Sequence, residues 1–578
     1  MGGIFFIFYN NNKTGQSNFN LSNDFLTGFN KMQTRGTEST YKVETNIDIT
    51  RIDRINGMEL KYLMSKRTIA EHKNFTYLFG KHTLQINDTT LDAVQPFEYP
   101  IDHYKYNIPH LKDVPKKKLL FSGEIYNHLQ LKLEYDTYEL QSDSDGEIIL
   151  PMYYKYGIDK TLEMLDGEYS FILTDNINGL NSEMDIYVVK DRFGTKPMYM
   201  VSNPISEVYM FTTEIKCIPS YILEDTNYTI IEIPNGSYWS YKSMGFVQYY
   251  SLDKFKQIAS TPVADPATMG SVYINIFEKI TNTIIKKIPG TKFGILLSGG
   301  FNSSLITSII VKHFRDTNRN TADIKLFTIG SCDNPDVKNA TELISYLENK
   351  YNIILEHHTI IIDTQHIREE IRDTIDNLIY QLETPDPDTI QDAIPYYYLY
   401  RYIKQYTDIK ILISGDSLNE IANGYSEINQ LSDIEFQKKN VELVQNISQL
   451  DILRTDNLTS NYNIEIRYPY LDVSFVEYYL NLHPKIKRPQ VYNTIKRTKY
   501  YIEKYLIRKA FDTGEYLPDT ILWRSINWSS QCIDTLETSL QDYFDGQGVS
   551  KQDYYMKIYN KYYKNQTKIK WQEAWTNK

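Results

Sequence analysis

Cysteine is scarce in this chain. Its three cysteines, Cys217, Cys332 and Cys532, are spread over a sequence of 578 residues. They are too few and too far apart for a disulfide framework or a zinc site, because both need several cysteines at close, regular spacing. This pattern fits a reducing, intracellular setting.

Long apolar runs and blocks of like charge are also missing. No stretch approaches the roughly 20 apolar residues that cross a bilayer as a helix. Met1 to Tyr9 have no basic region ahead of their short apolar run, so they predict a buried strand rather than a signal peptide. Lys and Arg number 62 against 73 Asp and Glu, a net charge of -11. We therefore expect neither a membrane nor a nucleic acid as a partner.

The pattern of apolar residues changes once along the chain. Up to about residue 225, short runs of β-branched and aromatic residues are broken by turns, which indicates a layered α+β domain. From about residue 270, Tyr273, Ile276, Phe277 and Ile280 follow helical spacing, and buried strands then alternate with helices, as in a doubly wound parallel sheet. The predicted organisation is a domain at 1–225, a join at 226–268, a domain at 269–565 and a C-terminal tail at 566–578.

A glycine-rich turn in the second domain has the pattern of a phosphate site. The apolar strand Lys292 to Leu297 is followed by Ser298-Gly-Gly-Phe-Asn-Ser-Ser304, where a helix is expected to begin. Two glycines let the backbone turn with its N–H groups exposed, and the positive end of the helix faces the same point. The turn lacks the Lys of the G-x-x-x-x-G-K-[ST] loop, so a different kind of phosphate loop is predicted.

This turn resembles the S-G-G-x-D-S loop of the ATP pyrophosphatases, which hold pyrophosphate while AMP is transferred to a carboxylate. Asn302 stands where that loop has Asp. Further motifs of the second half resemble, in order, the synthetase domain of the glutamine-hydrolysing asparagine synthetases. They are Phe327–Gly330 with Asn334–Asp336, Glu383–Thr389, Ser414–Glu420 with Gly424–Tyr425, Leu453–Asp456, Glu465–Asp472, Lys504–Arg508, Leu522–Arg524 and Ser550–Tyr555.

The first half resembles the class II glutamine amidotransferase domain of the same family. The matching elements are Gly3–Ile4, Arg35–Gly36, Ser122–Asn127, Ser144–Ile149, Met164–Glu168 and Asp191–Pro197. The resemblance thus covers nearly the whole chain. It implies an α+β amidotransferase-like layered domain followed by an α/β doubly wound ATP-pyrophosphatase-like domain.

In the family, an N-terminal Cys attacks the amide of glutamine. The resemblance puts Gly2 at this position, and glycine offers no nucleophile; losing one from a coupled catalytic unit can cost about six orders of magnitude in kcat. It puts Ser122 and Gly123 at the oxyanion hole, where a lost donor costs about 10²-fold or more. It puts the glutamine contacts at Thr83, Glu124 and Asp145, with Thr83 replacing an Arg. We therefore expect no glutamine hydrolysis.

The second half implies ATP-dependent conversion of aspartate and ammonia to asparagine, AMP and pyrophosphate, with Mg²⁺ as a cofactor. By resemblance, Glu383 is a catalytic carboxylate, and Asp386 and Gln391 contact the substrate. The metal positions are Asn302 and Asn419, both amides here, although Mg²⁺ prefers charged oxygen ligands. The implied ATP and pyrophosphate contacts are Leu297, Ser298, Gly299, Gly300, Asn302, Ser303, Ile329, Ser414 and Gly415.

Other substitutions accompany the two amides. Asp416 replaces a Glu and has a shorter stem, and Ile526 replaces a Lys of the family. The retained polar residues also have structural interpretations, because Ser303 can cap its helix and Glu383 can pair with a nearby Arg. We expect a glutaminase that is inactive and a synthetase site that is impaired, with ATP, aspartate and glutamine as the small molecules that the family uses.

Three alternatives stay open at this point. The chain can be an active amide ligase that uses ammonia or another amine. It can be a non-enzymatic binding or structural protein that reuses the fold, with a tyrosine-rich surface as the interface to a second copy or to another protein. Gly2 can also be an engineered substitution, in which case Asn302, Asn419 and Ile526 need separate explanations.

Overall fold

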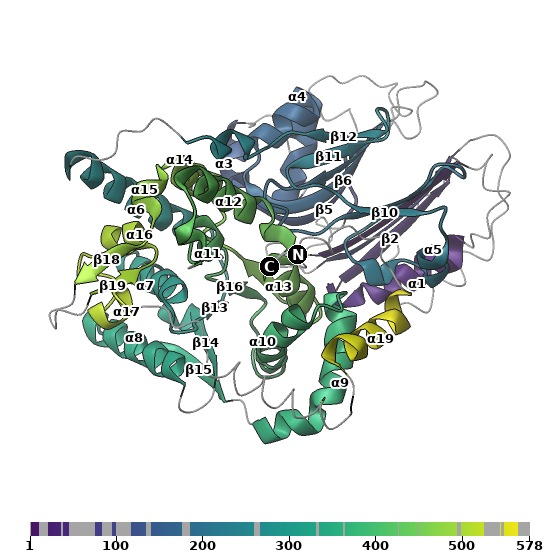
Figure 1. Cartoon of the computed structure of the whole chain (residues 1–578). Coiled ribbons are helices and arrows are strands. Elements are labelled where there is room, and N and C mark those ends of the chain that lie inside the picture. Colours follow the sequence, from purple (N-terminus) through teal and green to yellow (C-terminus); the bar gives the residue numbers. More distant parts are fainter. Residues whose placement is uncertain are drawn as a thin grey trace.

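A computed structural model describes most of the chain (Figure 1). The described residues are 2–10, 21–35, 38–45, 75–83, 95–99, 117–134, 140, 142–175, 185–258, 266–330, 334–361, 364–425, 427–449, 451–493, 499–524, 544, 548 and 550–564. Ile526 lies outside this set. None of the helices within these ranges has both the length and the apolar character needed to cross a membrane.

The N-terminal part consists of two six-stranded sheets, of order β10-β8-β9-β1-β3-β2 and β12-β11-β7-β6-β5-β4. All the strand pairs assigned in them are antiparallel. The strands are β1 (Gly2–Asn10), β2 (Glu38–Thr45), β3 (Phe75–Thr83), β4 (Phe97–Tyr99), β5 (Lys117–Ile125), β6 (Gly167–Asp175), β7 (Asp185–Lys190), β8 (Tyr199–Asn203), β9 (Val208–Thr212), β10 (Thr229–Glu232), β11 (Ser237–Ser240) and β12 (Gly245–Gln248). The predicted layered α+β domain is confirmed.

Strand β1 is apolar at successive positions because both of its faces are buried. Ile4, Phe6 and Phe8 belong to one buried cluster, together with residues of β5 and β6 in the other sheet. Phe5 and Ile7 point to the opposite face and pack with helix α1 (Leu21–Lys31). Side chains of a strand alternate between its two faces, so a strand buried on both faces is apolar throughout.

The region 226–268 differs from the join that its turn residues predict. It contains β10, β11 and β12, which extend the two N-terminal sheets at their edges. The motif Pro234-Asn-Gly236 is the turn between β10 and β11, and Gly236 has φ +61°. Because turn residues mark hairpins as well as linkers, composition alone did not separate the two cases. The N-terminal layers therefore reach at least to Gln248.

The C-terminal part is built on a five-stranded sheet of order β15-β14-β13-β16-β17, whose neighbouring strands are all parallel. These strands are β13 (Phe293–Leu296), β14 (Ile324–Gly330), β15 (Glu356–Ile361), β16 (Ile411–Ile413) and β17 (Glu465–Arg467). Helices surround the sheet, and a hairpin of β18 (Gln490–Asn493) and β19 (Lys499–Ile502) follows it. The predicted parallel α/β domain is confirmed.

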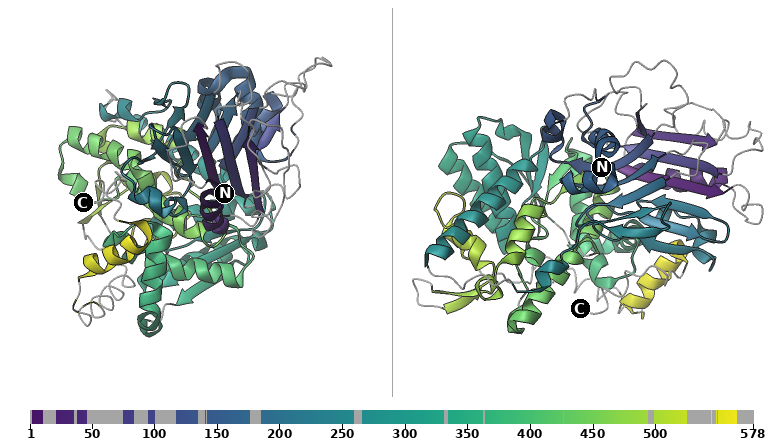
Figure 2. Two further views of the ribbon diagram at one scale, coloured as in Figure 1. Left: turned by 90° about the vertical axis from the view of Figure 1, so that its right-hand side faces the viewer. Right: turned by 90° about the horizontal axis from the view of Figure 1, so that it is seen from above.

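Helices are few in the N-terminal part and dominate the C-terminal part (Figures 1 and 2). The first part has, besides α1, helices α3 (His128–Glu134), α4 (Ile149–Met164) and α5 (Ser220–Glu224). The second part has α6 (Pro266–Lys286), α7 (Phe301–Asp316), α8 (Pro335–Tyr351), α9 (Thr364–Leu382), α10 (Pro387–Tyr406), α11 (Leu418–Ile421), α12 (Asp433–Gln445), α13 (Asp451–Ser460), α14 (Val473–Asn481), α15 (Pro484–Lys487), α16 (Tyr505–Ala510), α17 (Asp519–Leu522) and α19 (Lys551–Tyr563).

The strand order of the parallel sheet decides where a ligand can bind. From β13, the chain reaches β14 on one side through α7, and β16 lies on the other side. In doubly wound sheets, the crevice beyond the carboxyl ends of such diverging strands is the usual ligand site. The glycine-rich turn at Ser298 leaves β13 at this point.

Candidate functional site

A cavity of about 280 Å³ lies beyond the carboxyl ends of β13, β14 and β16. It brings together most of the residues that the sequence predicts for nucleotide and metal binding. Those in its wall are Leu297, Ser298, Asn302, Ser303, Ile329, Ser414, Gly415 and Asn419. Gly299 and Gly300 belong to the same turn. Other wall residues come from α8 and α10, among them Asp336 and Asp392.

The glycine-rich turn has a geometry that only glycine permits. Gly299 has φ +78°, and a Cβ atom there would lie 2.0 Å from the carbonyl oxygen of Asp336. The Ser303 hydroxyl oxygen accepts the backbone N–H of Ser298 at 3.1 Å and lies 2.9 Å from the Ser298 hydroxyl. Helix α7 begins at Phe301, so its positive end is held next to the cavity.

Two amides meet where the resemblance expects two carboxylates. Asn302 donates from Nδ2 to Oδ1 of Asn419 at 3.3 Å. The same Asn419 oxygen accepts a hydrogen bond from Lys504 Nζ at 2.6 Å. Lys504 precedes helix α16 and is only 1% exposed, and burial lowers its pKa to about 8, so its ammonium is still the main form at pH 7. A buried cation thus lies behind the amide pair.

These residues do not fit Mg²⁺. The ion needs hard and preferably charged oxygens, whereas the Asn419 oxygen already accepts two donors, one of them a cation. Asn302 Oδ1 is buried and has no hydrogen-bond donor among the described residues, but one uncharged oxygen cannot replace two carboxylates. In the described part of the chain, no cluster of three or more His, Cys, Asp or Glu residues is arranged to hold a metal.

The carboxylates in the cavity wall are held by other groups. Asp336 pairs with Arg524 at 3.0 Å, and Asp392 pairs with Arg454 at 3.2 Å. Asp416 accepts the Ser414 hydroxyl at 2.7 Å; burial raises the Asp416 pKa, and the Asp451 carboxylate raises it further. Each of these three carboxyl groups thus has a partner within the protein.

Glu383 lies at the boundary between the two halves and not in the cavity wall. Its carboxylate accepts the backbone N–H groups of Ile215 and Lys216 at 3.0 and 2.8 Å, and only 2% of the residue is exposed. Burial raises the pKa of Glu383 to about 7, and the nearby Glu214 carboxylate adds to the shift. In this position the side chain anchors a turn of the N-terminal part.

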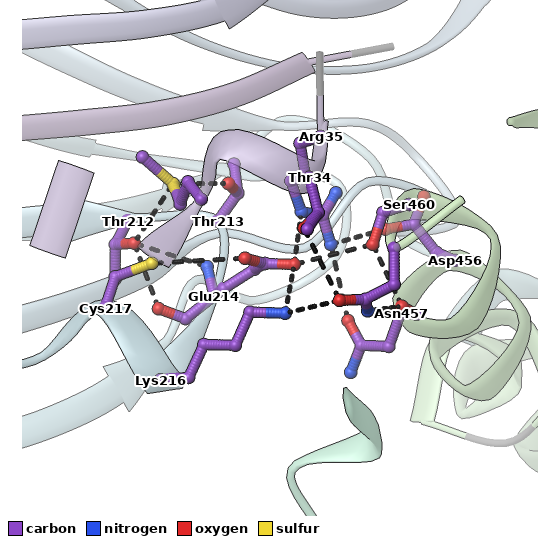
Figure 3. A network of polar contacts seen from close by, with 12 residues as sticks. Thr34, Arg35, Thr212, Thr213, Glu214, Lys216, Cys217, Asp456, Asn457 and Ser460 are labelled. Carbon is purple, nitrogen blue, oxygen red and sulfur yellow. Dashed lines mark hydrogen bonds and ion pairs between the residues drawn. The ribbon is translucent and has the colours of Figure 1, made fainter. Parts of the chain in front are cut away.

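A buried network of charges continues from this turn into helix α13 (Figure 3). Arg35 lies 2.7 Å from Glu214 and 2.9 Å from Asp456, which also pairs with Lys196 at 3.3 Å. Lys216 pairs with Glu214 at 3.1 Å. None of these side chains is more than 3% exposed. The network joins the two halves through charges of opposite sign.

The two predicted substrate contacts on α10 lie at or near its beginning. Asp386 is the N-cap residue and accepts the backbone N–H and the hydroxyl of Thr389 at 2.9 and 2.6 Å. Such a cap stabilises the first turn of a helix. Neither Asp386 nor Gln391 lines the cavity, whereas the neighbouring Asp392 does.

The predicted glutaminase residues lie together at the ends of β1, β3 and β5. Gly2 is paired with Thr83 in the sheet, and the Ser122 hydroxyl donates to the Gly2 carbonyl oxygen at 2.7 Å. Gly123 has φ +137°, and a Cβ atom there would lie 2.0 Å from the Glu168 carbonyl oxygen. Gly2 has no side chain that could attack an amide. The position at which the resemblance places the nucleophile therefore has none.

The remaining two glutamine positions are engaged in structural contacts. Glu124 pairs with Arg467 of β17 at 3.0 Å, so it forms a further ion pair between the halves. Asp145 accepts the Ile125 N–H at 2.6 Å, and burial raises its pKa to about 6. The carboxylate oxygens of Glu124 and Asp145 thus contact other residues of the protein.

Sequence reasoning singled out neither Lys504 nor Arg467 as site residues. Both stand within motifs that the sequence shares with the family, so the motifs contained the signal. The contacts that give them a role join residues that are distant along the chain, such as Lys504 with Asn419. A single sequence contains no sign of such a pairing.

Comparisons with known proteins agree with this arrangement. A model of the glutamine amidotransferase domain matches residues 107–220, and a model of asparagine synthase matches residues 289–441 and 435–547. The asparagine synthetase (glutamine-hydrolysing) of Rattus norvegicus is 28% identical over 489 residues, which cover 81% of this chain and 80% of that protein. The protein of the same description from Zea mays is 32% identical over 412 residues, or 70% of this chain and 64% of that protein.

The fold and the cavity define a two-part protein with an amidotransferase-like and an ATP-pyrophosphatase-like half. The chain belongs to the asparagine synthetase family.

Proposed function

We propose that this chain is an asparagine synthetase-family protein that hydrolyses no glutamine, forms no aspartyl adenylate at a useful rate, and keeps a pocket for a phosphate-bearing ligand. One observation carries the proposal. Asn302 and Asn419 form an amide pair next to Lys504 at the position where the family reaction needs Mg²⁺.

Charge explains why the synthetase step is impaired. A carboxylate about 4 Å from a divalent ion contributes several kcal/mol at an effective dielectric of about 20, so two amides in place of two carboxylates remove most of the attraction. Without the cation, the phosphates of ATP keep their full negative charge in the transition state. The carboxylate implied for catalysis, Glu383, has both oxygens occupied by backbone N–H groups.

The glutaminase step lacks its nucleophile. Gly2 is a strand residue whose carbonyl oxygen accepts the hydroxyl of Ser122, the residue at the oxyanion-donor position. That hydrogen bond directs the Ser122 hydroxyl of β5 to the backbone of β1 in the other sheet.

An active ligase that uses ammonia or another amine is the second candidate. The intact phosphate turn around Ser298 and the carboxyl group of Asp416 in the cavity wall favour it. A tyrosine-rich interface has less support. Although the chain has 50 tyrosines, those exposed among the residues whose side chains the structure describes are Tyr156, Tyr406 and Tyr501.

A product assay separates these functions. The purified chain is incubated with ATP, Mg²⁺, aspartate and either glutamine or ammonia, and glutamate, asparagine and pyrophosphate are measured over time. We expect no product above the background without protein. Pyrophosphate or asparagine that forms with ammonia would establish the ligase, and glutamate formation would contradict the inactive glutaminase.

Ligand binding is tested separately by thermal unfolding. A ligand that binds only the folded chain stabilises it by about 2.7 kcal/mol at a concentration 100-fold above Kd. We therefore expect ATP or pyrophosphate to raise Tm in the absence of turnover. A chain without either a product or a shift in Tm would have lost the pocket as a ligand site.

A further inference from the structure

The polarity of the cavity wall at Asn419 is opposite to that of a cation site. The Asn419 oxygen accepts donors from Lys504 and Asn302 at 2.6 and 3.3 Å. Lys504 has no acceptor group, so its ammonium fixes which end of the Asn419 amide faces it. The other end of the amide is an NH₂ group. This NH₂ group of Asn419, a residue of the cavity wall, is a hydrogen-bond donor and suits an anion.

The carboxyl groups of the cavity wall are engaged by other groups. Asp336 pairs with Arg524, and Asp392 pairs with Arg454, which Asp451 shares. Asp416 accepts the Ser414 hydroxyl. Among the described residues, Lys504 forms no ion pair, and its nearest carboxylates are engaged elsewhere: Glu503 pairs with Arg508, and Glu420 accepts the Tyr425 hydroxyl. The positive charge of Lys504 thus lies behind an uncharged amide.

Lys504, through its contact with Asn419, and the phosphate turn both lie next to the same cavity. Asn419, Asn302 and Ser298 all line the cavity, and helix α7 points its positive end at it. A helix end, a donor amide and a buried ammonium on one cavity form a set that can hold two neighbouring phosphate groups.

We infer that this pocket binds a diphosphate group without a divalent cation, and that Lys504 supplies, through the oriented amide of Asn419, the positive charge that Mg²⁺ supplies in a metal-dependent site. The inference rests on the proposed loss of the metal site. It adds the chemical class of the ligand, a metal-free diphosphate, either as inorganic pyrophosphate or as part of a nucleotide. Lys504 is a positioning residue in this account.

Calorimetric titration at pH 7 tests the inference. Pyrophosphate and ADP are titrated separately, each in excess EDTA and in excess Mg²⁺, into the full chain. We expect the Kd of the stronger ligand to differ less than about threefold between EDTA and Mg²⁺. The reason is that no metal ion takes part in holding the phosphate groups. The stronger of the two ligands shows whether the pocket is built for free pyrophosphate or for a nucleotide.

Variants assign the charge to Lys504. Lys504→Met should weaken binding by about tenfold or more in both conditions, since a nearby positive charge is lost in a partly buried site. Lys509→Met is the matched control, because Lys509 lies in the adjacent helix α16 and pairs with Asp512 on the surface. If Lys504→Met does not fold, Asn419→Leu removes the donor amide and keeps the lysine, and it should show the same loss.

Asn419→Asp reverses the polarity. It should abolish binding in EDTA and make binding depend on Mg²⁺. Wild-type binding that requires Mg²⁺, or equal affinity of the wild type and Lys504→Met, would overturn the inference. So would the absence of binding by either ligand at millimolar concentration. None of these results restores turnover, so the proposed loss of synthetase activity is judged independently by the product assay.

Discussion

The guanidinium of Arg35 lies 2.9 Å from the Asp456 carboxylate, and this ion pair joins the N-terminal layers to helix α13 of the parallel-sheet half. Both side chains are at most 1% exposed. A pair so deeply buried holds the two halves in one relative position, because separating them would leave two charges without partners.

Removing Arg35 should therefore destabilise the whole chain. We expect Arg35→Met to cost about 3–5 kcal/mol, since it leaves Glu214 and Asp456 as buried carboxylates short of a cation. Thermal unfolding and denaturant titration measure the loss. Arg401→Met is the control, because the Arg401–Glu370 pair is exposed and should contribute about 0–1 kcal/mol. Equal effects of the two substitutions would contradict a structural role for the buried network.

Glu383 gives the interface a pH dependence with a definite sign. Its pKa is about 7 in the folded chain, above the ordinary value of 4.5, so the folded state holds a proton more tightly than the unfolded state. The stability linked to this proton is fully present below pH 4.5 and is lost as the pH rises through about 7. The free energy of unfolding, compared between wild type and Glu383→Gln from pH 5 to 8, should show wild type losing more stability. A constant difference across this range would rule the linkage out.

Gly123 should tolerate no side chain. Its φ of +137° and a Cβ position 2.0 Å from the Glu168 carbonyl oxygen predict that Gly123→Ala destabilises the chain by about 1–3 kcal/mol or more. Gly270 in α6 provides the control, because a Cβ there meets nothing within 4 Å. Gly270→Ala should stabilise by about 0.5–1 kcal/mol, the usual gain in a helix. Circular dichroism during heating compares both variants, and a neutral Gly123→Ala would show that the strand relaxes.

Restoring the nucleophile alone should not restore the glutaminase. In Gly2→Cys, Thr83 and Ser122 still occupy the positions of the family's glutamine-binding Arg and oxyanion Asn, and each lost contact of this kind costs about 10²-fold or more. A coupled glutamate assay should therefore show no turnover above background for this variant. Glutamate formation by Gly2→Cys would mean that the pocket is intact apart from its nucleophile.

The fold was predictable to the extent that local patterns decide it. The run from Tyr169 to Thr174 lies within β6, and the run from Asp185 to Lys190 forms β7. The phosphate turn follows a parallel strand, as its glycines predict. Strands β10 to β12 were missed because the proline and glycine residues of their turns have the composition of a linker.

The candidate site was predictable only in part. The cavity gathers residues that the motifs identify, since they lie at or shortly beyond the carboxyl ends of strands of one sheet, and these ends meet. The contacts of Glu383 with Ile215 and of Lys504 with Asn419 depend on how distant segments pack. Packing of this kind has no periodic signal in one sequence, and it decides which polar residues face the ligand and which hold the halves together.

The most direct test of the account is aspartate-dependent exchange of labelled pyrophosphate into ATP, measured with Mg²⁺ in excess. This exchange reports adenylate formation alone and needs neither glutamine nor ammonia. Because Asn302 and Asn419 provide no carboxylate for the metal, we predict no exchange above the rate without aspartate. Exchange that depends on both aspartate and Mg²⁺ would contradict the account and identify the pocket as a working synthetase site.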